Sequence, residues 1–92
     1  MTRWTVDLRV AAKRDLKRLP EGPQQAAAEL IADLAEDPDQ VRGSEMRGYQ
    51  STWKARFHHD LYRMIYQVSR SQRRVIVTRI RPRPTAYEGL KR

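Results

Sequence analysis

The sequence predicts an α+β fold in which an antiparallel sheet rests on an N-terminal helical hairpin. Three observations predict it: an alternating segment opens the chain, two segments with helical spacing follow, and three strand-like segments occupy the second half. The 92 residues suit a single domain, 1–92, with one modest core. The chain has no cysteine, so a disulfide, a thiolate nucleophile and a cysteine metal site are all excluded.

The first part of the chain predicts one strand and two helices. Apolar residues alternate in residues 3–8, which indicates a short strand with one buried face. They then recur at helical spacing in residues 10–19 and from about 24 to 36. Prolines and a glycine in residues 20–23 break the first helix, and Asp37-Pro38 ends the second.

The second part predicts a loop followed by a three-stranded meander. Residues 39–51 contain two glycines and form the loop. Apolar and polar residues alternate in 52–58, residues 61–69 have the composition of a central strand, and 75–80 form the last strand after a polar turn at 70–74. This meander is expected to place one face on the helices.

Charge is distributed unevenly along the chain. Residues 1–41 carry six Lys/Arg and eight Asp/Glu, a net charge of −2, whereas residues 42–92 carry thirteen and three, a net charge of +10. A concentrated positive field attracts phosphate backbones and releases their counterions. A nucleic acid is therefore the first expected partner, and an acidic protein is the second.

The alternating strand offers a first candidate site. If its apolar residues Trp53, Ala55 and Phe57 face the core, then the opposite face presents Lys54, Arg56 and His58 at two-residue steps of about 7 Å. Two cations and an imidazole on one face suit a phosphodiester. An ordinary solvated face gives the same pattern, and spacing alone leaves both interpretations open.

Arg63 is a second candidate because it lies among large apolar residues, where a guanidinium needs a partner. One interpretation is a buried ion pair with a carboxylate such as Asp60 or Glu45. The other is an anion clamp, since guanidinium binds phosphate through two parallel hydrogen bonds.

The C-terminal segment adds further cations and one aromatic ring. Pro82 and Pro84 cannot donate to a ladder, so the sheet is expected to end near Ile80, and residues 85–92 add at most one helical turn. Arg79, Arg81 and Arg83 are either RNA contacts or solubilising charges on a stiff tail. Tyr87 either stacks on a base or anchors the tail.

The remaining inventory limits the chemistry. The sequence contains no glycine-rich phosphate loop and no zinc-ligand spacing, and its basic half has no paired carboxylates. The two histidines are adjacent, so no cofactor or metal is expected. Lys, Arg, His and Tyr fit RNA cleavage, where the ribose 2′-hydroxyl supplies the nucleophile. Neither a signal-peptide pattern nor an apolar run of ~20 residues occurs, so a cytoplasmic protein without a membrane partner is expected.

In order and spacing, these segments resemble the RelE/ParE family of bacterial toxins over nearly the whole chain. The residues that carry the resemblance are Trp4, Ala12, the run Arg14–Pro20, Leu34, Asp37-Pro38, Met46–Gly48, Trp53–Arg56, Tyr62–Val68, Ile80, Arg83 and Tyr87. The resemblance implies a β-α-α-β-β-β, microbial ribonuclease-like fold. It also implies a type II toxin that cuts mRNA in the ribosomal A site and is inhibited by a cognate antitoxin.

The resemblance further implies roles for individual residues. Lys54 and Arg56 match the family's basic pair, and Arg63 matches the arginine that holds the phosphate. Arg83 matches the arginine that stabilises or protonates the leaving group. Tyr87 matches the tyrosine that orients or deprotonates the attacking hydroxyl, or that stacks on the base.

The chain departs from the family pattern at two places. Many relatives have Gly-His-Arg where this chain has Arg81-Pro82-Arg83, so an imidazole role falls to His58, which is expected on the face of Lys54. Pro84 stiffens the approach to Tyr87.

Two other functions compete with the RelE-type nuclease. A ParE-type toxin poisons DNA gyrase on the same fold without being an enzyme, and a plain RNA-binding domain would need only the charge. The joint presence of Lys54, Arg63, Arg83 and Tyr87 favours the nuclease, and the helical hairpin disfavours a plain RNA-binding domain.

Overall fold

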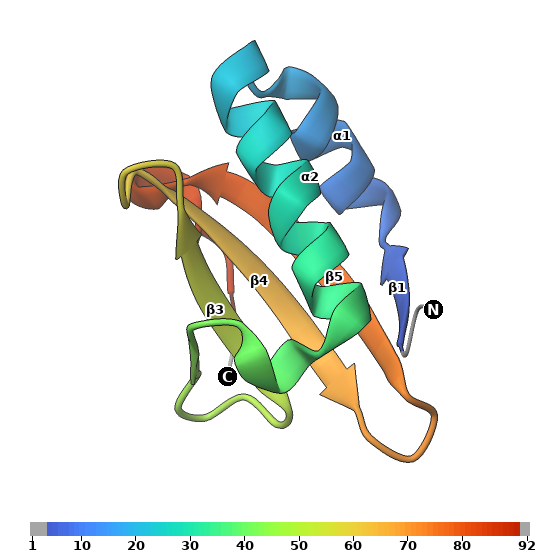
Figure 1. Cartoon of the computed structure of the whole chain (residues 1–92). Helices are drawn as coiled ribbons and strands as arrows, with labels where there is room; N and C mark the ends of the chain where they lie inside the picture. Colours follow the sequence, from blue (N-terminus) through green and yellow to red (C-terminus); the bar gives the residue numbers. More distant parts are fainter. Residues whose placement is uncertain (1–3, 91–92) are drawn as a thin grey trace.

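The structure, a computed structural model, describes residues 4–90 and contains two helices beside a five-stranded sheet within that range (Figure 1). In chain order the elements are β1 Thr5–Leu8, α1 Val10–Arg18, α2 Glu21–Glu36, the 3-10 turn η1 Pro38–Gln40, β2 Gly43–Glu45, β3 Thr52–Phe57, β4 Tyr62–Ser69, β5 Arg74–Pro82 and the 3-10 turn η2 Arg83–Thr85. The α+β fold with an N-terminal helical hairpin is confirmed. No helix among the described residues is long and apolar enough to span a membrane.

The sheet is mixed, so the expectation of an antiparallel sheet is wrong at one edge. The strand order is β1-β5-β4-β3-β2, and β1 runs parallel to β5 while the other neighbours are antiparallel. Apolar alternation marks the buried face of a strand but carries no information about its neighbour's direction.

A short strand lies inside the segment that was expected to be a loop. β2 has three residues and pairs with β3 through Gly43 and Ala55. A Cβ added at Gly43 would lie 2.6 Å from the Tyr66 hydroxyl oxygen and 3.1 Å from the Lys54 carbonyl oxygen. Glycine therefore permits this close approach, and so short a polar strand leaves no alternating pattern in the sequence.

Two other boundaries differ from expectation. α2 begins at Glu21 rather than near residue 24, because Gly22 and Pro23 lie in its first turn, where proline's missing N–H has no intrahelical partner to lose. β5 continues past Ile80 to Pro82. Pro82 is the last residue of the strand, where its missing N–H interrupts no further pairing.

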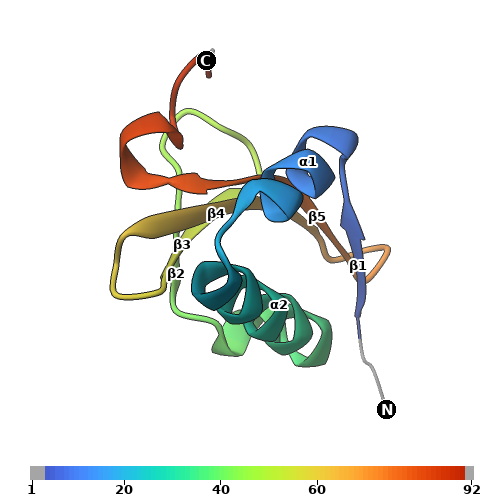
Figure 2. The same cartoon turned by 90° about the horizontal axis from the view of Figure 1, so that it is seen from above.

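The main core lies between α2 and one face of the sheet (Figure 2). Its buried residues come from every large element: Ala12, Leu19, Ala27, Leu34, Ala55, Phe57, Met64, Tyr66, Val75, Val77 and Ile80. α1 takes a different position, alongside β5 beyond the end of β1 (Figure 2). The backbone N–H of Arg9 donates to the Val77 carbonyl at 2.9 Å where the chain leaves β1 for this helix.

Asp15 attaches α1 to the free edge of β5. Its side chain is only 7% exposed, and Oδ2 accepts a hydrogen bond from the Ile80 backbone N–H at 3.1 Å and from Arg81 Nε at 3.2 Å. One carboxylate thus satisfies a strand N–H that has no neighbouring strand and neutralises a half-buried guanidinium.

Asp15→Ala is expected to lower the free energy of unfolding by about 2–4 kcal/mol, because it leaves a buried N–H and a half-buried guanidinium without an acceptor. Urea denaturation measures the change. The matched control is Asp7→Ala, since the Asp7–Arg74 pair is about half exposed on both sides and is worth roughly 0–1 kcal/mol. Equal losses in the two variants would contradict this role for Asp15.

Candidate functional site

The candidate site is the sheet face opposite α2, here called the open face. Strand pairing aligns Arg56 with Arg63 and Arg63 with Arg81, which makes one row of cations across β3, β4 and β5. A second row aligns Lys54 with Ile65 and Ile65 with Arg79. Neighbouring strands lie about 4.8 Å apart and the rows about 7 Å apart, so the backbones of the five residues lie close together. The Arg56 side chain, on β3, also lines a hollow with Asp33 and Glu36 of α2.

A β-bulge in β5 changes which of its side chains lie on each face of the sheet. The register with β4 shifts between Ile65 and Tyr66, so that Ile65 pairs with Arg79 while Tyr66 pairs with Val77. Thr78 is the extra residue, and its hydroxyl donates to the Ile65 carbonyl at 3.1 Å. The bulge therefore keeps Val77 and Ile80 in the core while Arg79 points to the open face.

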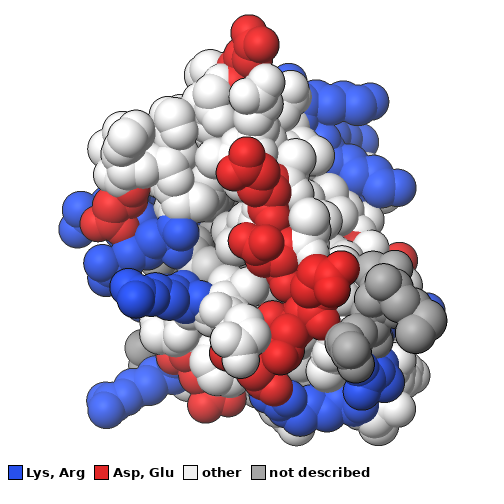
Figure 3. All heavy atoms as spheres, viewed as in Figure 1, with Lys and Arg blue, Asp and Glu red and all other residues white. Residues whose placement is uncertain are grey.

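Charge of the opposite sign lies on the other side of the molecule. Exposed acidic residues run along α2 and its C-terminal end, as the stripe in Figure 3 shows. They include Glu21, Glu29, Asp33, Glu36 and Asp39. Because this acidic stripe repels a polyanion, it favours approach to the open face.

Arg63 is buried, and its neighbours hold it firmly. Its side chain is 6% exposed, and Nη1 donates to the carbonyl oxygens of Asp60 at 2.8 Å and Tyr62 at 3.1 Å. The Asp60 carboxylate lies 3.4 Å from the same nitrogen. Of the two partners that the sequence left open for Arg63, Asp60 is the one in contact.

The C-terminal segment crosses the open face. Arg79 Nη1 donates to the Ala86 carbonyl at 3.2 Å and also to that of Glu88. Ala86 and Ile65 are both buried although neither belongs to the main core, so this segment covers the middle of the face. Tyr87 follows, with its ring centroid 5.5 Å from Lys54 Nζ and its surface 38% exposed.

Two of the expected cations remain the most accessible. The Arg56 side chain is 68% exposed, with Asp60 as its ion-pair partner at 3.4 Å. Arg83 is exposed in η2, directly after β5, and its guanidinium has no ion pair or hydrogen bond within residues 4–90. Arg81 lies on the same face, but its guanidinium forms an ion pair with Asp15 at the edge of β5.

The expectation that His58 shares the face of Lys54 is wrong. The strand ends at Phe57, and His58 has a φ of +50°, which interrupts the alternation. Its ring packs edge-on against Tyr62, and its Cε1 would be 3.3 Å from a Cβ at Gly22 in α2. His58 therefore lies on the helix side, away from the five cations.

A pocket of about 310 Å³ adjoins the end of the second row. It is lined by Met46, Arg47, Tyr49, Lys54, Tyr87 and Leu90. The sequence analysis used Arg47 only for the family resemblance and did not name Tyr49, because both belong to an irregular loop whose position no periodicity predicts. The signals for a site here were the family match at Met46–Gly48 and an arginine and a tyrosine close together in a basic half.

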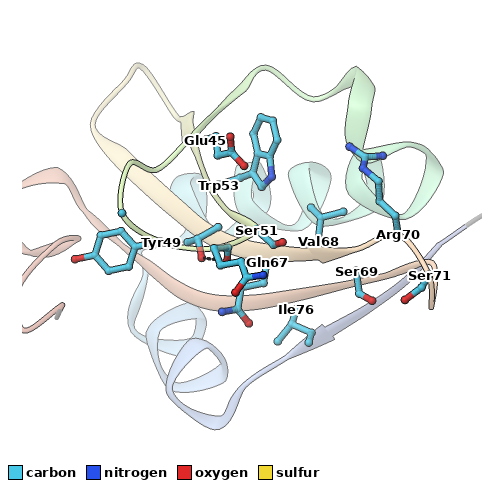
Figure 4. Close-up of a pocket in the computed structure, with 13 residues that line it drawn as sticks. Glu45, Tyr49, Ser51, Trp53, Gln67, Val68, Ser69, Arg70, Ser71 and Ile76 are labelled. Carbon is cyan, nitrogen blue, oxygen red and sulfur yellow. Dashed lines mark hydrogen bonds between the residues drawn. The ribbon is translucent and has the colours of Figure 1, made fainter. Parts of the chain in front are cut away.

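A larger hollow, of about 840 Å³, lies at the other end of the sheet and is drawn in Figure 4. Its lining consists mostly of uncharged polar side chains, and Arg70 is its one cation. None of the expected site residues lines it. Within the described residues, no group of three His, Asp or Glu side chains is placed to hold a metal ion.

A known protein family matches this sequence and has a fold of this kind. The model of the ParE toxin of the type II toxin–antitoxin system parDE matches residues 6–87, nearly the whole chain. The chain belongs to the RelE/ParE superfamily of type II toxins. Among curated protein sequences, none matches it.

Solved structures of this superfamily have the same fold. The RelBE2 toxin–antitoxin complex of Mycobacterium tuberculosis has a chain that is 30% identical, with a TM-score of 0.75 over 88% of this chain and 99% of that one. The isolated RelE toxin of E. coli is 19% identical, with a TM-score of 0.74 and coverage of 86% and 83%. The YoeB/ParE toxin of Agrobacterium tumefaciens is also 19% identical, with a TM-score of 0.72 and coverage of 85% and 96%.

Arg79→Ala is expected to release the C-terminal segment, because it removes the donor that binds two of its carbonyl groups. Amide hydrogen exchange in residues 83–90 should then become at least several-fold faster, with little change in β4. Arg74→Ala, which removes an exposed arginine of the same strand, is the control. Unchanged exchange in 83–90 would show that other contacts hold this segment.

Proposed function

We propose that this toxin is an mRNA endonuclease that cleaves transcripts in the ribosomal A site and so inhibits translation. The observation that carries the proposal is the alignment of Arg56, Arg63 and Arg81 in one row, with Lys54 and Arg79 in the next. A phosphodiester on this face would meet several cations at once, which favours the extra negative charge of a pentavalent phosphate. The ribosome would supply the aligned substrate.

The proposed reaction is an attack by the ribose 2′-oxygen on the adjacent phosphorus. The 2′-hydroxyl loses its proton, the O2′–P bond forms, and the P–O5′ bond breaks. The products are a 2′,3′-cyclic phosphate and a 5′-oxygen that receives a proton. The substrate contains its own nucleophile, so the protein has to align it, move protons and stabilise charge.

The side chains of the open face suggest a division of these tasks, in which the buried Arg63 is reached beside the exposed Arg56. Lys54 and Tyr87 lie together and would orient or deprotonate the 2′-hydroxyl. Arg63 and Arg56 would bind the non-bridging oxygens of the phosphate. Arg83, whose guanidinium has no ion pair or hydrogen bond within residues 4–90, would stabilise or protonate the leaving oxygen.

The second candidate is a ParE-like toxin that poisons DNA gyrase and has no enzymatic activity. The family model that matches the chain is that of ParE, which favours this alternative. Inducible expression in bacteria, with mapping of transcript 5′ ends, separates the two functions. Cuts within translated codons support the nuclease, whereas intact transcripts with broken chromosomes support gyrase poisoning.

We also propose that a cognate antitoxin inhibits the protein by covering the open face. Several of the similar solved structures are toxin–antitoxin complexes. The net charge of +10 after residue 41 favours an acidic segment that folds on binding. In the complex, amide exchange around Lys54, Arg63 and Arg83 should slow, or Tyr87 should be displaced; unchanged exchange there would argue against this binding mode.

Arg83→Ala is the most direct test of the nuclease, because within residues 4–90 this exposed guanidinium has no ion pair or hydrogen bond to lose. We expect the rate of codon cleavage to fall roughly 10²–10³-fold while the unfolding midpoint is unchanged. Arg14→Ala, which removes an exposed arginine of α1, should retain cleavage.

Arg63→Ala should cause a loss of similar size. Its fold must be checked first, because Arg63 also binds two carbonyl groups of the turn. If growth arrest persists in both arginine variants, the nuclease proposal is wrong and gyrase poisoning is favoured.

A further inference from the structure

The connection between β3 and β4 has an unusual backbone that places a carboxylate within the row of cations. His58, His59 and Asp60 have φ values of +50°, +59° and +67°, three successive non-glycine residues in the left-handed region. This backbone conformation is unfavourable for residues with a side chain, although Asp and His tolerate the region better than most. The turn is retained by hydrogen bonds to its carbonyl groups, including the one from the Arg83 N–H to Leu61 O at 2.9 Å.

The carboxylate of Asp60 bridges two arginines of the open face. Its Oδ1 lies 3.4 Å from Arg56 Nε and 3.4 Å from Arg63 Nη1. These arginines are direct partners across the β3–β4 pairing. A single oxygen between two guanidinium groups occupies the kind of position that a non-bridging phosphate oxygen would take.

The position of Arg63 depends little on this carboxylate. Its hydrogen bonds to the two carbonyl oxygens, at 2.8 and 3.1 Å, are shorter than the 3.4 Å contact to the carboxylate. The Asp60 side chain is 51% exposed, so it can rotate into solvent, whereas the Arg63 side chain is 6% exposed and stays in place. The carboxylate is therefore the displaceable member of this cluster.

We propose that Asp60 is an internal competitor of the RNA phosphate, whose carboxylate must leave before the phosphate can contact Arg56 and Arg63. This inference rests on the proposed binding of RNA at the open face. Asp60 lowers the affinity of the site for phosphodiesters, so that only a substrate that makes further contacts, such as those to Lys54 and Arg83, binds well. Asp60 thus sets the selectivity of the face without taking part in bond breaking.

The test is a binding titration of the full-length protein with a single-stranded 2′-O-methyl RNA, which cannot be cleaved. Asp60→Asn removes the charge but keeps the side-chain shape. We expect it to bind roughly five-fold more tightly at low salt, because one repulsive charge near the phosphate is lost. The slope of log K against log salt should steepen by about 0.7, the value for one additional neutralised phosphate of a single strand.

Glu45→Gln is the matched control, because it makes the same change in net charge on exposed β2, away from the arginine pair. Asp60→Gly is the second variant; glycine accepts the positive φ without cost, so it tests the charge even if the asparagine variant does not fold. Tighter binding and a steeper slope in an Asp60 variant, but not in the Glu45 variant, support the proposal. Affinities equal to or weaker than that of the control, or no RNA binding by any of the proteins, overturn it.

This titration does not measure cleavage, so its outcome is separate from the nuclease proposal. A toxin that cuts no transcripts, but whose Asp60→Asn variant binds RNA more tightly, contradicts the nuclease and leaves the role of Asp60 intact. A toxin that cuts transcripts, but whose Asp60 variants bind no more tightly than the control, contradicts only the role of Asp60.

Discussion

The register of β3, β4 and β5 is the constraint on which the candidate site depends. A slip of one residue in β4 would turn Arg63 into the core and Met64 out of it, exchanging the two faces of the strand. Burial of Met64, Tyr66 and their neighbours under α2 therefore fixes the cations on the opposite face. In β5, both Val77 and Ile80 lie in the core, although they are three residues apart and regular alternation would place them on opposite faces. The bulge at Thr78 resolves this conflict and leaves Arg79 on the open face.

Like charges this close repel one another, and the protein offsets the repulsion with its own oxygen atoms. Asp15 neutralises Arg81, carbonyl groups of the C-terminal segment accept hydrogen bonds from Arg79, and Asp60 serves Arg56 and Arg63. These partners differ in how easily they can move away from their arginines. Asp15 is buried and binds a strand N–H as well, so it is structural, whereas Asp60 is half exposed and can move.

The sequence was sufficient for the helices, for every strand except β2 and for most of the cationic face, because these depend on local periodicity. Alternation in β3 correctly placed Lys54 and Arg56 opposite Ala55, and the proline and glycine positions marked the helical hairpin. The sequence could not predict the direction or the neighbours of each strand, because these depend on contacts between distant segments. β1, near the start of the chain, pairs with β5, near its end. The sequence also could not predict the three left-handed residues after Phe57, and they account for the wrong side assigned to His58.

Binding of a phosphodiester strand across the open face can be followed through the ¹⁵N side-chain signals of the arginines during titration with the 2′-O-methyl RNA at low salt. The Nε–H signals of Arg56, Arg63 and Arg83 should shift first and furthest, while those of Arg14 and Arg18 on α1 change little. Shifts confined to the α1 arginines, or spread evenly over all arginines, would show that RNA does not bind at this face.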